Sequence, residues 1–244
     1  MAYISTQALV LRSVNWREND RIITLLTPDR GRVEALVRGS RKPKSALMAA
    51  SQLFTLGNYV LFKGKGHELV VSCEVKDSYY PLRGDYDKLS YASIILSSAE
   101  MAVQLEEPQP HLMILLIRTL TRLAYTDLDD RAVTSAYLLH FISLIGYKPR
   151  LAHCVSCSKE IKDGREGWLD PQAGGLLCKN CKNTHTTSMK LEPDAVMWLR
   201  SVLIQGIEKS LSLPRVIPLL QIKKYVEYVL DRQLPQLPEY ISRL

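Results

Sequence analysis

Residues 32–45 read Arg-Val-Glu-Ala-Leu-Val-Arg-Gly-Ser-Arg-Lys-Pro-Lys-Ser, and their pattern changes halfway along the stretch. Val33, Ala35 and Val37 alternate with polar side chains, which predicts a strand with one buried face. The alternation breaks at Gly39, and around it stand four cations without a compensating acid: Arg38, Arg41, Lys42 and Lys44. A polyphosphate backbone suits such a cluster, because each contact with a phosphate releases condensed counterions. A solvated loop that serves only solubility is the alternative.

Apolar runs on either side of this stretch predict four further strands, at about residues 8–11, 22–26, 53–62 and 67–75. Turn sequences such as Thr27-Pro28-Asp29-Arg30-Gly31 separate them. The pattern is interrupted between the third and fourth strands, where residues 46–50 favour about one helical turn. Five short strands of this kind fit a five-stranded barrel of the OB type. An SH3-like barrel would have almost the same pattern, so the sequence leaves the strand order open.

Helical periodicity replaces the alternation after residue 80. Pro81-Leu82-Arg83-Gly84 marks the expected boundary, and helices are expected at about 85–106, 112–125, 131–145, 191–208 and 216–230. Pro108 and Pro110 should separate the first two helices, and Asp129 or Asp130 should cap the third. The predicted fold class is therefore α+β with several domains. We expect an OB-fold barrel in residues 1–80, a helical domain in 81–149 and 189–244, and an inserted cysteine segment in 150–188.

Two C-x-x-C pairs form the strongest local signal in the chain. Cys154 and Cys157 make the first pair, Cys178 and Cys181 make the second, and twenty residues separate the two pairs. Two such turns that face each other form a closed tetrahedral site for one Zn²⁺, and a closed shell of four thiolates indicates a structural metal. Reduced thiols without a metal are the alternative. His153 and His185 lie beside the pairs as substitute ligands, and Cys73 is expected in the barrel core.

The bulk composition is that of an ordinary globular protein, with 46% hydrophobic and 23% charged residues in 244. The net charge of +7 and the isoelectric point near 9.1 favour acidic partners such as nucleic acid. No run reaches the ~20 apolar residues of a membrane-spanning helix, so no membrane association is expected. The N-terminus lacks a basic stretch followed by an apolar one, so we expect a cytoplasmic protein with reduced thiols.

The common catalytic motifs are absent from the sequence. It contains no G-x-x-x-x-G-K-[ST], H-E-x-x-H or G-x-S-x-G, and no H-x-E ahead of a P-C-x-x-C motif. Asp127, Asp129 and Asp130 could form a nuclease site, but acids just before a helix are better explained as caps that interact with its dipole. We therefore expect a protein that is not an enzyme.

The N-terminal pattern resembles the RecO family of DNA repair and recombination proteins. The resemblance rests on residues 8–12, on residues 18–27, on Gly31 and on Val37-Arg38-Gly39-Ser40-Arg41-Lys42-Pro43-Lys44-Ser45. The order of a barrel, a helical part and an inserted cysteine segment also matches. The similarity covers essentially the whole chain and is weakest in the last thirty residues.

Membership of this family would imply a recombination mediator. Such proteins bind single- and double-stranded DNA, anneal complementary strands, and help RecA load onto DNA covered by single-strand-binding protein (SSB), together with the partner RecR. The family contacts the acidic C-terminal tail of SSB at the helical domain, and Lys223, Lys224 and Arg232 are candidates for that contact. A solvated helix face explains these three residues equally well. The resemblance leaves the oligomeric state and the RecR stoichiometry open.

An OB barrel holds single strands in a basic groove with stacking aromatic residues. The candidate stackers are Trp16, Tyr59 and Phe62, of which we expect Phe62 in the core and leave Trp16 open. Two other hypotheses remain: an RNA-binding or ribosome-associated factor with a barrel and a zinc ribbon, and a scaffold that binds only acidic protein tails. The candidate nucleic-acid-binding cations are Arg12, Arg17, Arg21, Arg38, Arg41, Lys42, Lys44, Lys63 and Lys65.

Overall fold

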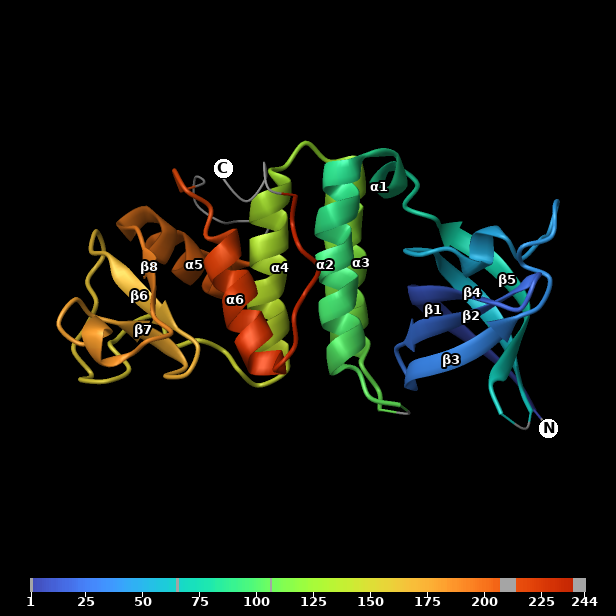
Figure 1. The fold of residues 1–244 in the computed structure, drawn as a ribbon, viewed down its shortest axis with the longest axis horizontal. Coiled ribbons are helices and arrows are strands. Elements are labelled where there is room, and N and C mark those ends of the chain that lie inside the picture. The colour runs from blue at the N-terminus through green and yellow to red at the C-terminus, as the bar shows by residue number, and fades with distance from the viewer. Residues whose placement is uncertain (1, 65, 106, 207–213, 239–244) are drawn as a thin grey trace. The chain divides into compact units, whose positions relative to one another are not determined.

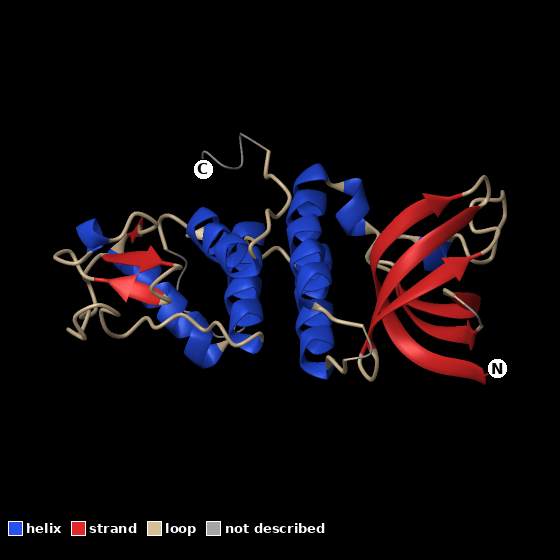
Figure 2. Cartoon of the chain, turned by 60° about the horizontal axis from the view of Figure 1, so that its bottom comes forward, coloured by secondary structure: helices blue, strands red, loops and turns tan. Residues whose placement is uncertain are grey.

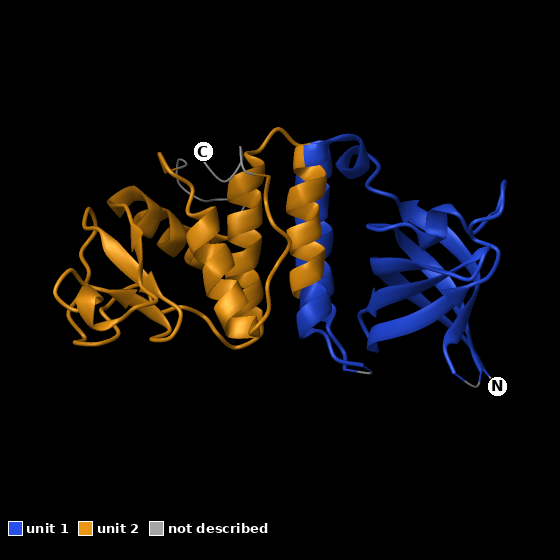
Figure 3. Ribbon diagram, viewed as in Figure 1, with its two compact units in different colours: residues 1–86, 99–125 blue, residues 87–98, 126–244 orange. Residues whose placement is uncertain are grey.

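The computed structural model describes residues 2–64, 66–105, 107–206 and 214–238. It divides into two compact units, and each is described by itself below. Unit 1 comprises residues 1–86 and 99–125, and unit 2 comprises residues 87–98 and 126–244 (Figure 3). Within the described ranges, no helix has both the length and the apolar character needed to cross a membrane.

Unit 1 begins with a closed barrel, whose strands curve around a common core (Figures 1 and 2). The order around the barrel is β1-β2-β3-β5-β4, with β1 hydrogen-bonded to both β2 and β4. β3 runs parallel to β5 through only two paired positions, Ala35 with Glu68 and Leu36 with Leu69. The five strands are β1 (Ala2–Trp16), β2 (Asp20–Thr27), β3 (Gly31–Val37), β4 (Leu56–Lys63) and β5 (Glu68–Asp77).

This strand order is that of an OB-type barrel, so the predicted fold class is confirmed and the order left open by the sequence is resolved. The alternation in β3 works as expected, because Val33, Ala35 and Val37 all belong to the barrel's buried core. The expected helical turn between the third and fourth strands is a short 3₁₀ helix, η1 (Ala49–Ser51). β1 is much longer than its apolar centre at residues 8–11, because its ends pair with β2 and β4 although most of their side chains are exposed.

The chain returns to the barrel after α2 and packs against the turn between β2 and β3. The amide of Arg32 donates to the carbonyl of Gln104 at 3.2 Å, and the amide of Gln109 donates to the carbonyl of Pro28 at 3.0 Å. Gly31 lies beneath this crossing with a φ of 58°. A Cβ atom there would overlap the carbonyl oxygen of Glu107, so the position requires glycine both for its φ and for the close approach.

The first helices differ from the expectation at their ends. Pro81–Gly84, expected as a boundary turn, is a short helix, α1. α2 (Tyr86–Ala102) ends four residues before the expected position, and α3 (Pro110–Tyr125) begins at the proline expected to separate the two helices. Proline fits the first turn of a helix because its missing N–H has no intrahelical partner there.

Unit 2 is built around α4 (Asp130–Leu144), which contacts α5 (Pro193–Gln205) and α6 (Leu219–Leu230). The last two helices therefore pack on α4. α6 begins three residues later than expected, directly after Pro218, and α5 ends before Gly206, which has a φ of 78°. The expected helix end at Glu208 lies outside the described residues.

The cysteine segment contains a small antiparallel sheet in the order β7-β6-β8 (Figure 1). Its strands are β6 (Gly167–Asp170), β7 (Gly175–Leu177) and β8 (Met189–Leu191). Gly174, with a φ of 75°, turns the chain from β6 into β7. Gly174 thus allows a short hairpin between the two cysteine pairs.

Candidate metal centre and nucleic-acid interface

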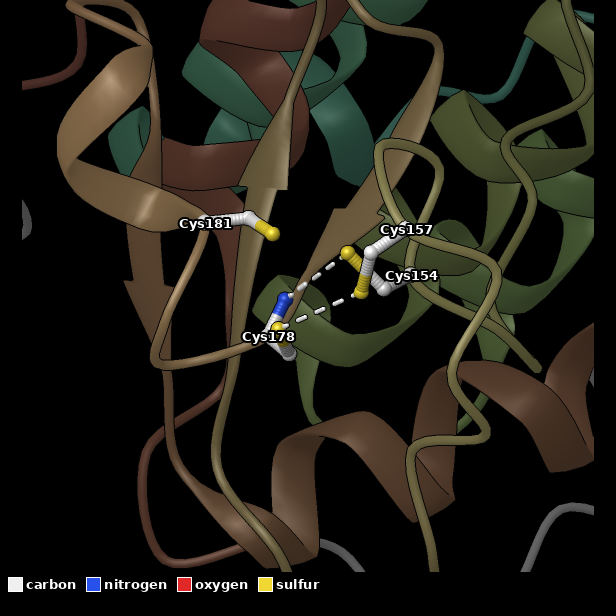
Figure 4. Close-up of side chains that lie close together, drawn as sticks. All are labelled: Cys154, Cys157, Cys178 and Cys181. Carbon is white, nitrogen blue, oxygen red and sulfur yellow. Dashed lines mark hydrogen bonds between the residues drawn. The ribbon is translucent and has the colours of Figure 1, made fainter.

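The four cysteines of the two C-x-x-C pairs come together in unit 2. Their Sγ atoms all lie within 4.8 Å of one another (Figure 4). Cys154 is buried, Cys157 is exposed, and the other two side chains are half-buried. The Sγ atoms of Cys157 and Cys178, one from each pair, are 3.8 Å apart. Four cysteine sulfurs are thus close enough to one another to bind a single metal ion.

The sulfur spacing can be compared with what a zinc ion requires. A tetrahedral Zn–S bond of about 2.3 Å places neighbouring sulfurs about 3.8 Å apart. The Cys157–Cys178 separation has this value, and no other pair of the four sulfurs is more than 4.8 Å apart. The residues present therefore fit a four-thiolate zinc site, in which Cys154, Cys157, Cys178 and Cys181 would hold the ion.

The sulfur of Cys154 is prepared to carry negative charge. Burial alone would raise the pKa of the Cys154 thiol, but the backbone N–H groups of Cys178, Cys157 and Ser156 point at the sulfur and lower the pKa to about 6. The amide of Cys178 donates to this sulfur at 3.3 Å (Figure 4). Metals bind the thiolate form of cysteine. The backbone amides from both C-x-x-C pairs point at the Cys154 sulfur and therefore favour the form that can bind a metal.

Backbone pairing between residues 150–155 and β7 fixes the two cysteine pairs relative to each other. The amide of Leu176 donates to the carbonyl of Arg150 at 2.9 Å, and the amide of Val155 donates to the carbonyl of Leu176 at 2.8 Å. Gly175 lies at the closest approach, where an added Cβ would be 2.8 Å from the nitrogen of Arg150 and would overlap its carbonyl oxygen. This position therefore requires glycine.

Arg200 of α5 connects the cysteine segment to the helices, and no pattern in the sequence indicated this role. Its guanidinium donates two hydrogen bonds to the carbonyl of Leu151, at 2.9 and 2.7 Å, and one to the carbonyl of Ile161, at 2.6 Å. It also pairs with the carboxylate of Asp163 at 2.6 Å. A single long arginine on a helix carries no periodic signal, so only the fold could identify it.

The two histidines considered as substitute ligands are not among the clustered metal-binding groups of the described chain. His153 is exposed, and Nδ1 of His185 lies 3.7 Å from the buried carboxylate of Asp170.

Asp129 acts as the helix cap that the sequence favoured over a nuclease site. Its Oδ1 accepts hydrogen bonds from the amides of Arg131 at 2.8 Å and Ala132 at 3.2 Å.

The basic loop after β3 lies on the surface of unit 1. Arg38, Lys42 and Lys44 are exposed, and none of the three has an ion-pair partner in the part of the chain that the structure describes. The loop is anchored at its start, where the amide of Gly39 donates to Oδ1 of Asp20 at 2.8 Å. These three cations are therefore open to solvent on a loop whose backbone is anchored to β2 at its start.

Arg41 has a different position from the other three cations of the loop. Its Nη1 donates to the carbonyl of Glu18 at 2.9 Å and to that of Arg17 at 3.3 Å, and its amide donates to the carbonyl of Asn19 at 3.0 Å. Arg41 thus ties the basic loop to the turn between β1 and β2. Trp16 and the exposed Arg17, at the end of β1 and in this turn, are held beside the loop.

The remaining cations predicted to bind nucleic acid differ in exposure and in their partners. Arg12 is exposed but lies 3.5 Å from the carboxylate of Glu100, and Arg21 is half-buried with Nη1 donating to Oγ of Ser51 at 3.1 Å. Lys63 is exposed at the end of β4. Lys65 lies outside the described residues.

The three candidate stacking residues differ in their burial. Tyr59 is fully buried in the barrel core, where its hydroxyl donates to the carbonyl of Ala50 at 2.7 Å, so the suggestion that it stacks on bases is wrong. Phe62 is half-buried and is not part of the buried barrel core, so the expectation that it lies in the core is wrong. Its ring centre lies 5.2 Å from that of Tyr3. Trp16 is 46% exposed, which leaves its ring accessible.

One of the three cations considered for the SSB tail is inaccessible. Lys223 is only 5% exposed, and its Nζ lies 2.5 Å from the carboxylate of Glu227 and 3.5 Å from the carbonyl of Leu234. It therefore joins α6 to the following chain and cannot meet a partner's tail. Lys224 and Arg232 are exposed.

Comparison with known proteins agrees with the family that the sequence resembles. The family model for the N-terminal part of recombination protein O matches residues 1–79, and the model for its C-terminal part matches residues 83–239. A protein of Acetivibrio thermocellus called DNA repair protein RecO is 31% identical over 83% of this chain and 80% of its own. Proteins of the same name from Alkaliphilus metalliredigens and Heliobacterium modesticaldum are 31% and 34% identical, over 94% and 83% of this chain and 94% and 74% of their own.

Proposed function

The chain belongs to the RecO family of DNA repair and recombination proteins, and from this premise we propose that it is a recombination mediator that binds DNA through its barrel. It acts by binding and has no catalytic turnover of its own. In this proposal it binds single- and double-stranded DNA and anneals complementary strands in the cytoplasm, at the nucleoid. With RecR it helps RecA load onto DNA coated with SSB, whose acidic tail meets Lys224 and Arg232.

The observation that carries this proposal is the basic surface at one edge of the barrel. Arg38, Lys42 and Lys44 are exposed and without acidic partners in the described chain, and Arg41 holds their loop beside Arg17 and the exposed ring of Trp16. Cations beside an aromatic ring are what a barrel of this type needs for a single strand, with the ring stacking on a base for ~1–3 kcal/mol. Phosphate contacts carry no sequence information, so little sequence preference is expected.

Family membership favours DNA over RNA as the ligand, and so argues against the ribosome-associated alternative.

A metal bound by the four cysteines would be Zn²⁺ with a structural role. A closed shell of four thiolates leaves no position for water or substrate. The ion would stabilise a segment too short to bury a core of its own. Elemental analysis of freshly purified, reduced protein should return one zinc per chain, and a protein without metal would contradict this part of the proposal.

The binding site is tested by reversing the three free cations, Arg38→Glu, Lys42→Glu and Lys44→Glu, in one variant. Loss of three phosphate contacts should lower the slope of log K against log salt by about 2 on single-stranded DNA. The control carries the same charge change elsewhere, as Arg118→Glu, Lys148→Glu and Arg215→Glu, and should keep the wild-type slope. A folded barrel variant that keeps the wild-type slope would show that DNA binds elsewhere.

Two further measurements test the mediator role and the stacking residue. A strand-annealing assay, with bare DNA and with SSB-coated DNA, should show acceleration by the wild-type chain in both cases. Tryptophan fluorescence should be quenched by single-stranded DNA through Trp16, because Trp168 and Trp198 are 6% and 2% exposed. Trp16→Phe should abolish the quenching, and quenching that persists in this variant would place the contact elsewhere.

A further inference from the structure

The cysteine segment carries a second cationic surface that the barrel site does not explain. A hollow of about 440 Å³ lies beside the metal ligand Cys178 in unit 2. Four cations line it, together with two acids: Lys159, Lys162, Arg165, Lys179, Glu160 and Glu166. All four cationic side chains are exposed.

The acids of this region are largely committed to other cations. Glu166 lies 3.3 Å from Nζ of Lys190, which it shares with Glu192 at 2.9 Å, and Asp163 pairs with Arg200. The four cations that line the hollow have no ion-pair partner in the described ranges. The hollow therefore presents positive charge to solvent that the segment does not neutralise internally.

The metal centre itself bears on this charge. One divalent ion and four thiolates have a formal charge of −2, and nearby cations stabilise thiolates. Charge balance for the metal is thus the simplest explanation of the four cations. Counted together with Lys182, whose Nζ lies 4.3 Å from the centre of the Trp168 ring, and with Lys190, they make six cations. The negative charges number five: two from the centre and one each from Glu160, Glu166 and Glu192. An excess of positive charge remains.

The two cysteine pairs also organise the cations. Lys159 follows Cys157 by two residues, and Lys179 directly follows Cys178, so each turn presents one lysine. A metal that fixes both turns fixes both lysines around the same hollow. Asn180, from the second turn, adds a neutral amide that can donate hydrogen bonds to phosphate oxygens.

We propose that this hollow is a second binding surface for single-stranded DNA, which contacts phosphates through Lys159, Lys162, Arg165 and Lys179. The proposal rests on the proposed function, since the ligand class is the same, but it concerns a different unit of the chain. One phosphate-binding surface in each unit allows one chain to hold two strands. Annealing requires two strands on the same protein, with their phosphate repulsion screened.

The test uses the full chain in the Arg38→Glu, Lys42→Glu, Lys44→Glu background, so that residual binding reports the second surface. This background then receives four further substitutions, Lys159→Glu, Lys162→Glu, Arg165→Glu and Lys179→Glu. The affinity for a fluorescent oligothymidylate is measured at salt concentrations between 50 and 200 mM. Loss of four phosphate contacts should lower the remaining slope by about 3, which corresponds to about 50-fold in affinity over this salt range. The matched control carries Arg118→Glu, Lys148→Glu, Arg150→Glu and Arg215→Glu, and should bind like the background.

Zinc content is measured for every variant, because loss of metal could mimic loss of a contact. A second variant with glutamine at the same four positions removes the charge without adding repulsion. Glutamine variants that keep zinc and lose binding support the proposal. Variants that bind zinc more weakly but keep the DNA slope would overturn it, since the cations would then serve only the thiolates.

Strand annealing separates this proposal from the proposed function. In an otherwise wild-type chain, the four cysteine-segment reversals should leave single-strand binding at the barrel intact and slow annealing at least tenfold. Annealing at the wild-type rate would overturn the second surface while leaving the barrel site standing. A barrel variant without effect would refute the proposed site and leave this one untouched. If the cysteine-segment surface binds RNA more tightly than DNA of the same sequence, the proposal that its ligand is DNA is refuted.

Discussion

Arg200→Met should loosen the attachment of the cysteine segment, because Arg200 supplies hydrogen bonds that no neighbouring side chain replaces. Methionine keeps the length and apolar stem of the side chain but removes every donor. The carbonyls of Leu151 and Ile161, both in buried residues, would then lose guanidinium donors at 2.6 to 2.9 Å. A buried group left without its partner costs about 1–3 kcal/mol, so the two carbonyls together give about 2–6 kcal/mol.

The ion pair with Asp163 should contribute little to this loss. The Asp163 side chain is 76% exposed, and exposed pairs contribute at most about 1 kcal/mol. Asp163→Asn therefore separates the charge pair from the carbonyl contacts and should be nearly neutral. Arg200→Lys should fall between wild type and methionine, because an ammonium group cannot reach both carbonyls with the planar geometry of a guanidinium.

The measurement is urea unfolding followed by tryptophan fluorescence in a Trp16→Phe background. The remaining tryptophans, Trp168 and Trp198, both lie in unit 2 and are almost fully buried. The midpoint should shift to lower urea for Arg200→Met, while DNA binding by the barrel stays unchanged. An unfolding free energy within 0.5 kcal/mol of wild type would refute the reasoning about Arg200.

Three other perturbations have defined outcomes. Chelation should remove one zinc per chain and expose Trp168 to solvent while the circular dichroism of the barrel persists; loss of the barrel signal would contradict independent units. Gly175→Ala should weaken metal binding, measured by competition with a chromogenic chelator, because its Cβ would overlap the carbonyl oxygen of Arg150; wild-type affinity would refute this. Burial lowers the pKa of His140, with a smaller lowering by Lys148 and an opposing backbone hydrogen bond at Val202. The stability that the neutral imidazole contributes is therefore complete above about pH 6.5 and is lost as the pH falls through the lowered pKa. In His140→Gln, the unfolding free energy should depend less on pH below about 6.5. An unchanged pH profile in this variant would contradict the assignment to His140.

The parts of the fold that follow from local pattern could be predicted from the sequence. The alternation in residues 33–37 indicated a strand with one face in the core, and the spacing of Cys154, Cys157, Cys178 and Cys181 indicated that four sulfurs would meet. Both signals are properties of neighbouring residues. The strand order could not be predicted, because the pairing of β1 with β4 depends on contacts between residues far apart in the chain.

The burial and partners of single polar or aromatic residues were the least predictable features. Tyr59 and Lys223 have side chains typical of a surface, yet one lies in the core and the other is enclosed against Glu227. Arg41 and Arg200 look like ordinary surface cations in the sequence, but their guanidinium groups bind backbone carbonyls. Pro110 was expected to keep two helices apart and instead begins one, because proline is excluded only from a helix interior.

The crossing of the chain over Gly31 has a consequence for how the protein is made and divided. The amides of Arg32 and Gln109 find their carbonyl partners only once the chain has passed through α2, so the five strands alone leave the tip of the β2–β3 hairpin uncovered. On the ribosome, a nascent chain that has emerged only to residue 80 still lacks that cover. A fragment intended to carry the barrel by itself would be cut more safely after Tyr125 than after Asp77.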